Sequence, residues 1–326
     1  MTALRAIETG CHTAFPAPAP RRSTVAADDG VPLAVTEYGS PSAPLTIVFV
    51  HGHCLRSESF DYLREHLGTT FGTDTRMVFY DHRGHGNSGS GPVHSYTIDQ
   101  LGHDLDVVLR TVVPTGPVVL VGHSMGAMTA MVYARQHPEQ IGSRIVGIGL
   151  LATAASGITE AGFGKFLRRP TVAVLNAAVR WAPGVLHASK RMGRTICAPI
   201  VRNAGFGNRR VSPAMVAFAT AMLNETSVVT MSSFLASFRS FDESATLASL
   251  SCIPTLVIGG SADFMTPFQH SVAIAQRVSG AELVCLDGAG HSLILERAAE
   301  VARSIAALVS RVSNELASSY ELAAAS

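Results

Sequence analysis

Apolar residues along the chain form short continuous runs, separated by segments in which apolar residues recur at helical spacing. Continuous runs favour strands that are covered on both faces, as in a parallel sheet. The segment from Ile98 to Val112 has helical spacing, follows a capping box formed by Thr97 and Gln100, and ends before Pro114. This alternation predicts an α/β fold with a mostly parallel sheet. Its strands are expected at residues 45–50, 76–80, 118–121, 145–151, 255–258 and 281–286.

The N-terminal part follows a different pattern. Residues 24–27 and 31–38 flank an Asp29-Gly30 turn, which predicts an antiparallel hairpin before the parallel strands. Residues 1–22 end in PAPAPRR, so we expect a flexible and partly polyproline tail. The first residues carry charges and lack the apolar stretch of a signal peptide, and no apolar run approaches the length of a membrane span. We therefore expect a cytoplasmic protein.

Strand–helix alternation stops at residue 153 and resumes near residue 251. The segment 153–246 is helix-like and contains 11 basic and 4 acidic residues, whereas the rest of the chain has 14 basic and 20 acidic residues. We interpret it as a helical cap inserted into an α/β core of residues 23–152 and 247–326. Its Met and Phe residues at helical spacing are interpreted mainly as cap core, with some available for an acyl pocket; they are Met215, Phe218, Met222, Met231, Phe234 and Phe238.

Composition narrows the functional classes. The chain is 47% apolar and 15% charged, which argues against disorder, and its net charge of +1 gives no general case for nucleic-acid binding. The five cysteines form no CxxC pair, and His51-x-His53 lacks the following Asp of a metallohydrolase motif because Leu55 stands there. We therefore expect neither a metal nor an organic cofactor.

The candidate nucleophile is Ser124 in Gly122-His123-Ser124-Met125-Gly126, which follows a predicted strand and precedes a predicted helix. A strand–turn–helix context gives the G-x-S-x-G pattern its meaning. The tight turn requires small flanking residues and presents the serine hydroxyl above the sheet.

A serine hydroxyl needs a base and a group that orients the base. His291 follows the last predicted strand in a glycine-rich loop, and Asp263 follows the strand before it. Loops at the carboxyl ends of parallel strands share one edge of the sheet, so Ser124, Asp263 and His291 are expected to meet there. Asp287 is the competing acid, but it lies only four residues before His291 and is expected to shape that loop.

An oxyanion hole requires two backbone N–H donors aimed at one point. We expect one from Met125 and the other from the loop His51-Gly52-His53-Cys54. His53 is the preferred second donor and Cys54 is the alternative.

Residues 84–89 also satisfy a dinucleotide-binding G-x-G-x-x-G pattern, and Asp104 follows 20 residues after Gly84. The predicted helix begins only at Ile98 and not at this loop. We therefore interpret residues 84–89 as a tight structural loop in which Asp81 and Arg83 are held by local hydrogen bonds.

Taken together, HGHC at 51–54, DHRGHGNSG at 81–89, GHSMGA at 122–127, GGSADFMTP at 259–267 and GAGHS at 288–292 resemble the α/β-hydrolase superfamily. The resemblance is closest to its capped esterase, lipase and haloperoxidase-like branch. It implies an eight-stranded sheet, a cap after strand six and the roles given above. The serine at position 124 argues against the branches whose nucleophile is aspartate.

We expect a serine hydrolase that cleaves carboxylic esters or thioesters with an apolar acyl part through an acyl-enzyme. The same triad also allows acyl transfer or cofactor-free perhydrolysis. An inactive binding protein with this fold is a further alternative. The expected partner is a small or lipid-like substrate. The basic cap also allows contact with an anionic substrate or an acidic membrane surface through Arg168, Arg169, Arg191, Arg194, Arg209 and Arg210.

Overall fold

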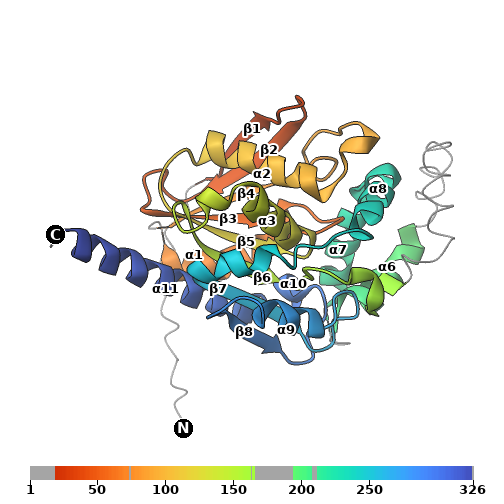
Figure 1. Cartoon of the computed structure of the whole chain (residues 1–326). Helices are drawn as coiled ribbons and strands as arrows, with labels where there is room; N and C mark the ends of the chain where they lie inside the picture. Colours follow the sequence, from red (N-terminus) through yellow and green to blue (C-terminus); the bar gives the residue numbers. More distant parts are fainter. Residues whose placement is uncertain (1–18, 73–74, 163, 166–193, 208–210, 325–326) are drawn as a thin grey trace, which may run out of the picture.

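A computed structural model describes residues 19–72, 75–162, 164–165, 194–207 and 211–324 (Figure 1). Its centre is an eight-stranded sheet in the order β1-β2-β4-β3-β5-β6-β7-β8. β2 pairs antiparallel with β1 and β4, and every other pairing is parallel, as expected. The strands are β1 (Arg21–Ala26), β2 (Pro32–Tyr38), β3 (Leu45–Val50), β4 (Thr75–Tyr80), β5 (Val118–His123), β6 (Ile145–Leu151), β7 (Thr255–Gly260) and β8 (Glu282–Leu286).

The first strand begins earlier than the sequence pattern predicts. Arg21 pairs with Glu37 and Arg22 with Thr36 in the β1–β2 ladder, and the Arg21 guanidinium lies 3.3 Å from the Glu37 carboxylate. The expectation of a tail that extends to residue 22 is therefore wrong for its last two residues. Residues 1–18 lie outside the described residues.

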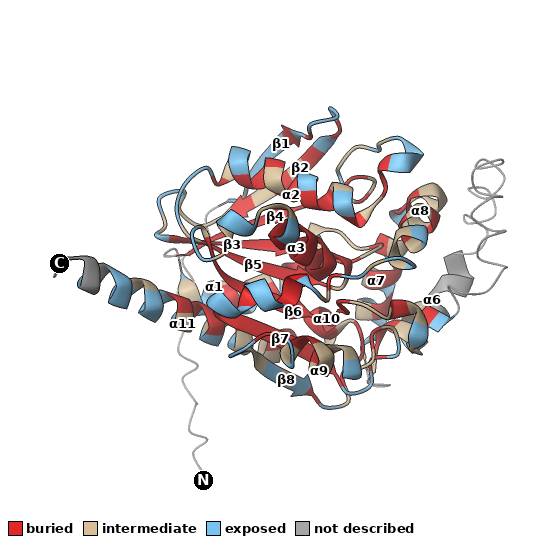
Figure 2. Ribbon diagram, viewed as in Figure 1, coloured by how far each residue is buried: buried red, intermediate tan, exposed pale blue. Residues whose placement is uncertain are grey.

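Helices cover both faces of the sheet. α2 and α3 pack on one face and α1 and α11 on the other, so the sheet separates two apolar clusters. Val48 and Val50 point into the first cluster and Ile47 and Phe49 into the second, which explains why β3 is a continuous apolar run. Figure 2 shows the central strands as buried.

The helices described are α1 (Asp61–Phe71), α2 (Ile98–Val112), α3 (Met125–Gln136), α6 (Arg194–Gly205), α7 (Pro213–Glu225), α8 (Val228–Phe238), α9 (Gln269–Ala275), α10 (Leu293–Glu296) and α11 (Ala298–Ala324). The 3₁₀ turns are η1 (Ser57–Phe60), η2 (Val93–Ser95), η3 (Pro138–Gln140), η4 (Ile158–Glu160) and η6 (Thr246–Cys252). Half of the expected capping box of α2 is present: the Thr97 side chain accepts a hydrogen bond from the Gln100 amide, whereas the Gln100 side chain donates to Asp104 at 3.2 Å.

The segment 153–246 joins β6 to β7, and its described part contains α6, α7 and α8, which lie together at one end of the sheet (Figure 1). α7 and α8 meet at an angle of 92°. Among the described residues, no single helix is long and apolar enough to cross a membrane. The boundaries of the cap stay a prediction. The cap arginines Arg168, Arg169, Arg191, Arg209 and Arg210 lie outside the described residues.

Candidate active site

The structure brings together the three side chains that the sequence singled out. His291 Nε2 lies 2.9 Å from Ser124 Oγ, and His291 Nδ1 lies 2.9 Å from Asp263 Oδ2. Ser124 comes from the turn between β5 and α3, Asp263 from the loop after β7, and His291 from the loop after β8. Asp263 and His291 are only 5% and 7% exposed, so the hydrogen-bonded chain is largely shielded from bulk water.

The turn at Ser124 explains both glycines of the motif. Ser124 has φ 53° and ψ −115°, a strained conformation for a residue with a side chain. A Cβ on Gly126 would lie 1.9 Å from the Val50 carbonyl oxygen, and one on Gly122 would lie 2.4 Å from the Ala127 nitrogen. The Ser124 amide donates to the Leu151 carbonyl at 2.8 Å, which holds the turn over the sheet.

Four hydrogen bonds fix the Asp263 carboxylate. Oδ1 accepts from the Met265 and Thr266 amides at 2.8 and 2.9 Å, and Oδ2 accepts from His291 and from the Thr266 hydroxyl, each at 2.9 Å. Burial alone would raise the pKa of Asp263. The attraction of His291 and the hydrogen bonds from His291 and Thr266 outweigh burial and lower that pKa, which keeps the carboxylate ionised.

Asp287, the competing acid, has a different role. Its side chain is exposed, and Oδ1 accepts from the Ser261 hydroxyl at 3.0 Å. The Ser261 hydroxyl in turn accepts from the Gly288 amide at 2.8 Å. Asp287 therefore shapes the loop that leads to His291.

Two further side chains hold the His291 loop, and the sequence analysis did not single out either. His123 Nε2 donates to the His291 carbonyl at 2.9 Å, and Glu296 accepts from the Gly290 amide at 2.6 Å. Burial lowers the pKa of His123 to about 3, so its ring is neutral near pH 7. The end of α6 also contacts this loop, because the Ser292 amide donates to the Gly205 carbonyl at 2.7 Å.

The loop after β3, residues 51–54, contains both candidates for the second donor of the expected oxyanion hole. The Cys54 amide donates to His85 Nε2 at 3.1 Å, so this N–H is already used within the protein. That contact argues against Cys54 as the second donor. The His53 ring lies edge-on to Phe238 of α8, with ring centroids 5.5 Å apart. Met125 is the first residue of α3, where the helix dipole favours a negative charge.

A cluster of buried histidines forms hydrogen bonds with the backbone of this loop and of its neighbours. Burial lowers the pKa of His51 to about 4 and that of His85 to about 3. His51 Nε2 accepts from the His82 amide at 3.0 Å, and His82 Nε2 donates to the His51 carbonyl at 3.0 Å. The rings therefore serve as neutral backbone partners. No group of three or more His, Cys, Asp or Glu within the described ranges could hold a metal ion.

The glycine-rich loop at residues 84–89 is structural. Arg83 is fully buried and pairs with Asp104 at 2.6 Å and with Asp29 at 2.7 Å. The Asp81 carboxylate accepts from the Ser57 and Asn87 amides at 2.7 and 2.8 Å. Asp104 is thus the partner of a buried arginine, and the next helix, α2, begins only after this loop has ended.

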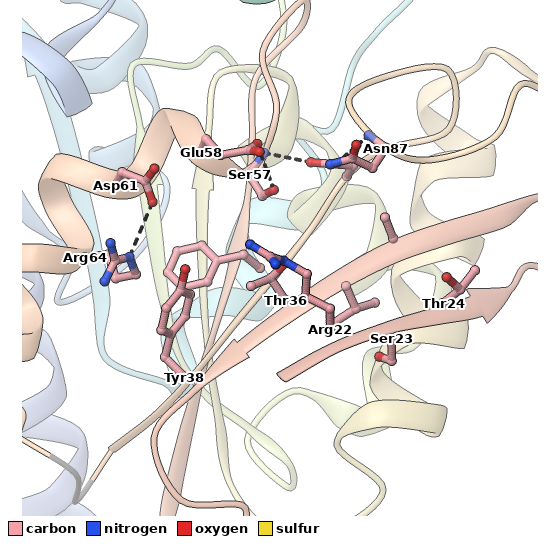
Figure 3. Close-up of a pocket in the computed structure, with 14 residues that line it drawn as sticks. Arg22, Ser23, Thr24, Thr36, Tyr38, Ser57, Glu58, Asp61, Arg64 and Asn87 are labelled. Carbon is pink, nitrogen blue, oxygen red and sulfur yellow. Dashed lines mark hydrogen bonds and ion pairs between the residues drawn. The ribbon is translucent and has the colours of Figure 1, made fainter. Parts of the chain in front are cut away.

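A separate polar pocket of about 600 Å³ opens beside the β1–β2 hairpin (Figure 3). Arg64 donates to Asp61 at 3.3 Å, and its guanidinium lies 4.4 Å from the centre of the Tyr38 ring. Arg22 points into the same space from β1. Ser124, Asp263 and His291 are not among the described residues that line this pocket, so it lies outside the candidate active site.

Comparison with known proteins identifies the family of the chain. The family model described as serine aminopeptidase, S33, matches residues 41–298. The chain is 26% identical over 262 residues to the AB hydrolase superfamily protein YisY of Bacillus subtilis, covering 80% of this chain and 90% of that protein. It is 25% identical over 276 residues to proline iminopeptidase PfmaB of Pestalotiopsis fici, covering 82% of this chain and 92% of that protein.

The fold is also shared with solved structures. A putative aryl esterase from Burkholderia cenocepacia superposes with a TM-score of 0.73 and 21% identity over 90% of this chain and 100% of that chain. At this identity the likeness shows the fold alone. Together with the family match, it confirms the resemblance drawn from the five motifs. The chain is therefore a hydrolase that belongs to the serine aminopeptidase S33 family of the α/β-hydrolase superfamily.

Proposed function

We propose that this protein is a serine hydrolase that cleaves carboxylic ester or thioester bonds of substrates with an apolar acyl part. The observation that carries the proposal is the continuous hydrogen-bonded chain from Asp263 through His291 to Ser124, with 2.9 Å at each link. A carboxylate, an imidazole and an alcohol in this order are the parts needed for acyl transfer to serine.

In the first half-reaction, Ser124 Oγ attacks the substrate carbonyl carbon while His291 Nε2 takes the hydroxyl proton. The ionised Asp263 stabilises the imidazolium that forms. His291 then protonates the leaving alcohol or thiol, the bond from the carbonyl carbon to that group breaks, and the acyl group remains on Ser124. Water repeats the sequence in the second half-reaction, which releases the acid and restores the serine.

The tetrahedral intermediates carry a negative oxygen. The backbone N–H groups of Met125 and His53 are the proposed donors to that oxygen. Met125 begins α3, and Cys54, the alternative to His53, has its amide engaged by His85. Fixed donors of this kind stabilise the transition state because they need no rearrangement as the charge develops.

The cap helices support an apolar acyl part. Met222 and Phe234 are 2% and 0% exposed and belong to the packed interior, as expected for most of these residues. Met215, Phe218 and Phe238 are partly buried and pack at the edge of the apolar clusters. Phe238 also lies edge-on to the His53 ring, with ring centroids 5.5 Å apart, so an apolar side chain of the cap borders the proposed oxyanion loop.

The test is a series of p-nitrophenyl esters and acyl-CoA thioesters of increasing acyl length, with proline p-nitroanilide as the peptidase substrate. We expect ester turnover by the wild type and none by Ser124→Ala. Turnover of the anilide alone would identify a peptidase and overturn the proposal. Equal ester turnover by Ser124→Ala would also overturn it.

The covalent intermediate also permits acceptors other than water. Product analysis with a competing alcohol or with hydrogen peroxide separates hydrolysis from acyl transfer and perhydrolysis. Free acid as the main product supports the hydrolase proposal, whereas a transferred acyl group or a peracid as the main product favours these alternatives. A purified wild-type protein that turns over none of the substrates would favour a binding protein.

A further inference from the structure

The hydroxyl of Thr266 lies between the acid and the base of the candidate triad. Thr266 Oγ1 is 2.9 Å from Asp263 Oδ2 and 3.2 Å from His291 Nδ1, so it contacts both ends of the bond that joins these residues. Thr266 is 6% exposed, which leaves little room for water to replace its hydroxyl. The sequence motif GGSADFMTP includes this threonine without distinguishing it from its neighbours.

The direction of the hydroxyl proton follows from the chemistry of its partners. An ionised carboxylate only accepts hydrogen bonds, so Thr266 must donate its one proton to Asp263. Toward His291 it then presents only lone pairs. A contact of 3.2 Å between these lone pairs and Nδ1 is favourable only when Nδ1 carries a proton.

The rest of the carboxylate is also fixed. The second oxygen of Asp263 accepts the Met265 and Thr266 amides, so the carboxylate cannot rotate to offer His291 a different oxygen. Thr266 therefore holds Asp263 through its amide and its hydroxyl together. A neutral imidazole with a proton on Nδ1 has its lone pair on Nε2, which lies 2.9 Å from the Ser124 hydroxyl.

We propose that Thr266 is a positioning residue that fixes the Nδ1–H tautomer of His291 and thereby keeps Nε2 as the base facing Ser124. This inference rests on the proposed function, since it assigns Thr266 a part in the same reaction. Asp263 favours the same tautomer. Thr266 adds a second acceptor for the Nδ1 proton. Its amide and hydroxyl also keep the Asp263 carboxylate oriented toward the His291 ring.

The tautomer that the inference requires is tested by ¹⁵N NMR of wild-type protein labelled at histidine, with His291→Gln used to assign the signals, and the part played by Thr266 is tested by the kinetic comparison that follows. We expect the neutral His291 ring to carry its proton on Nδ1. A proton on Nε2 in the neutral ring would overturn the inference, and this result does not depend on any threonine variant folding.

The kinetic test compares Thr266→Val, Thr266→Ser and the control Thr255→Val on a p-nitrophenyl ester. Thr255 is 1% exposed, begins the strand that leads to Asp263, and donates its hydroxyl to the carbonyls of Leu250 and Ile253. It is therefore a buried threonine of the same core with no contact to the triad among the described residues.

We expect Thr266→Val to lower kcat by at least about tenfold, which is the lower limit of the rate equivalent of one charge-assisted hydrogen bond, with KM nearly unchanged. Thr266→Ser should recover most of this loss, and Thr255→Val should keep the wild-type kcat. A wild-type kcat in Thr266→Val, or an equal loss in Thr266→Ser or Thr255→Val, would overturn the inference. Absence of ester turnover in the wild type would instead overturn the proposed function, and the NMR measurement would still test the tautomer.

Discussion

Replacement of Gly126 by alanine is a sharp test of how the nucleophile turn is built. The added Cβ would lie 1.9 Å from the Val50 carbonyl oxygen and 2.7 Å from the His51 carbonyl oxygen. Both are backbone atoms, so no flexible side chain can move aside. Real Cβ contacts stay above 3.0 Å, so the end of β3 or the start of α3 must move by about 1 Å.

The displaced segments carry the expected oxyanion donors. Val50 directly precedes the loop of residues 51–54, which contains His53, and α3 begins with Met125. A displacement of about 1 Å at a reacting centre can cost roughly a hundredfold in rate. Overpacking of a dense core also costs about 1–3 kcal/mol in the free energy of unfolding. We expect losses of that order in kcat and in stability together.

The assay is urea denaturation combined with kcat on a p-nitrophenyl ester. Gly68→Ala is the matched control, because Gly68 lies within α1 and an added Cβ there would meet nothing within 4 Å. This control should gain about 0.4–1 kcal/mol through a less flexible unfolded chain and keep its kcat. Wild-type stability and wild-type kcat in Gly126→Ala would refute the packing argument.

Three other predictions follow from the triad, the buried ion pair of Arg83 and the buried histidines. Asp263→Asn should lower kcat by roughly 10³–10⁴-fold, because an amide N–H facing Nδ1 selects the wrong tautomer; a loss below about tenfold in steady-state kinetics would contradict the assigned acid. Arg83→Met should cost about 3–5 kcal/mol in urea denaturation, because it leaves the fully buried Asp104 without its cation, and restoration by adding Asp104→Leu is the control; a loss below about 1 kcal/mol would contradict that pairing. The lowered pKa values of His51 and His85, about 4 and about 3, mean that the unfolded chain binds more protons below pH 6.5, so the free energy of unfolding should fall by about 2 kcal/mol per histidine from pH 7 to pH 5. Stability that stays constant over that pH range would contradict their burial as neutral rings.

Features set by local sequence could be predicted well. The turn at Ser124 requires small neighbours within two residues, and the start of α2 depends on Thr97 and Gln100, which are three residues apart. The order of Ser124, Asp263 and His291 could be predicted because parallel strands end at one edge of the sheet. Each of these signals lies within a few residues or in the order of the elements.

Side-chain contacts that neither a local motif nor the order of the strands indicates could not be predicted. The Thr266 hydroxyl meets His291 across 25 residues, and Arg83 meets Asp104 across 21 residues, a spacing that also fits a dinucleotide-binding pattern. The choice between His53 and Cys54 depends on His85, which comes from another loop. Pairing with β2 likewise draws Arg21 into the sheet despite its proline-rich neighbours.

The central claim is that Ser124 is a nucleophile activated by His291. The most direct measurement is mass spectrometry of the protein after treatment with a fluorophosphonate, with peptide mapping of the adduct. We predict one adduct per chain, located on Ser124, which forms rapidly in the wild type and is nearly absent in His291→Ala. An adduct on another residue, no adduct in the folded wild type, or equally rapid labelling of His291→Ala would contradict the claim.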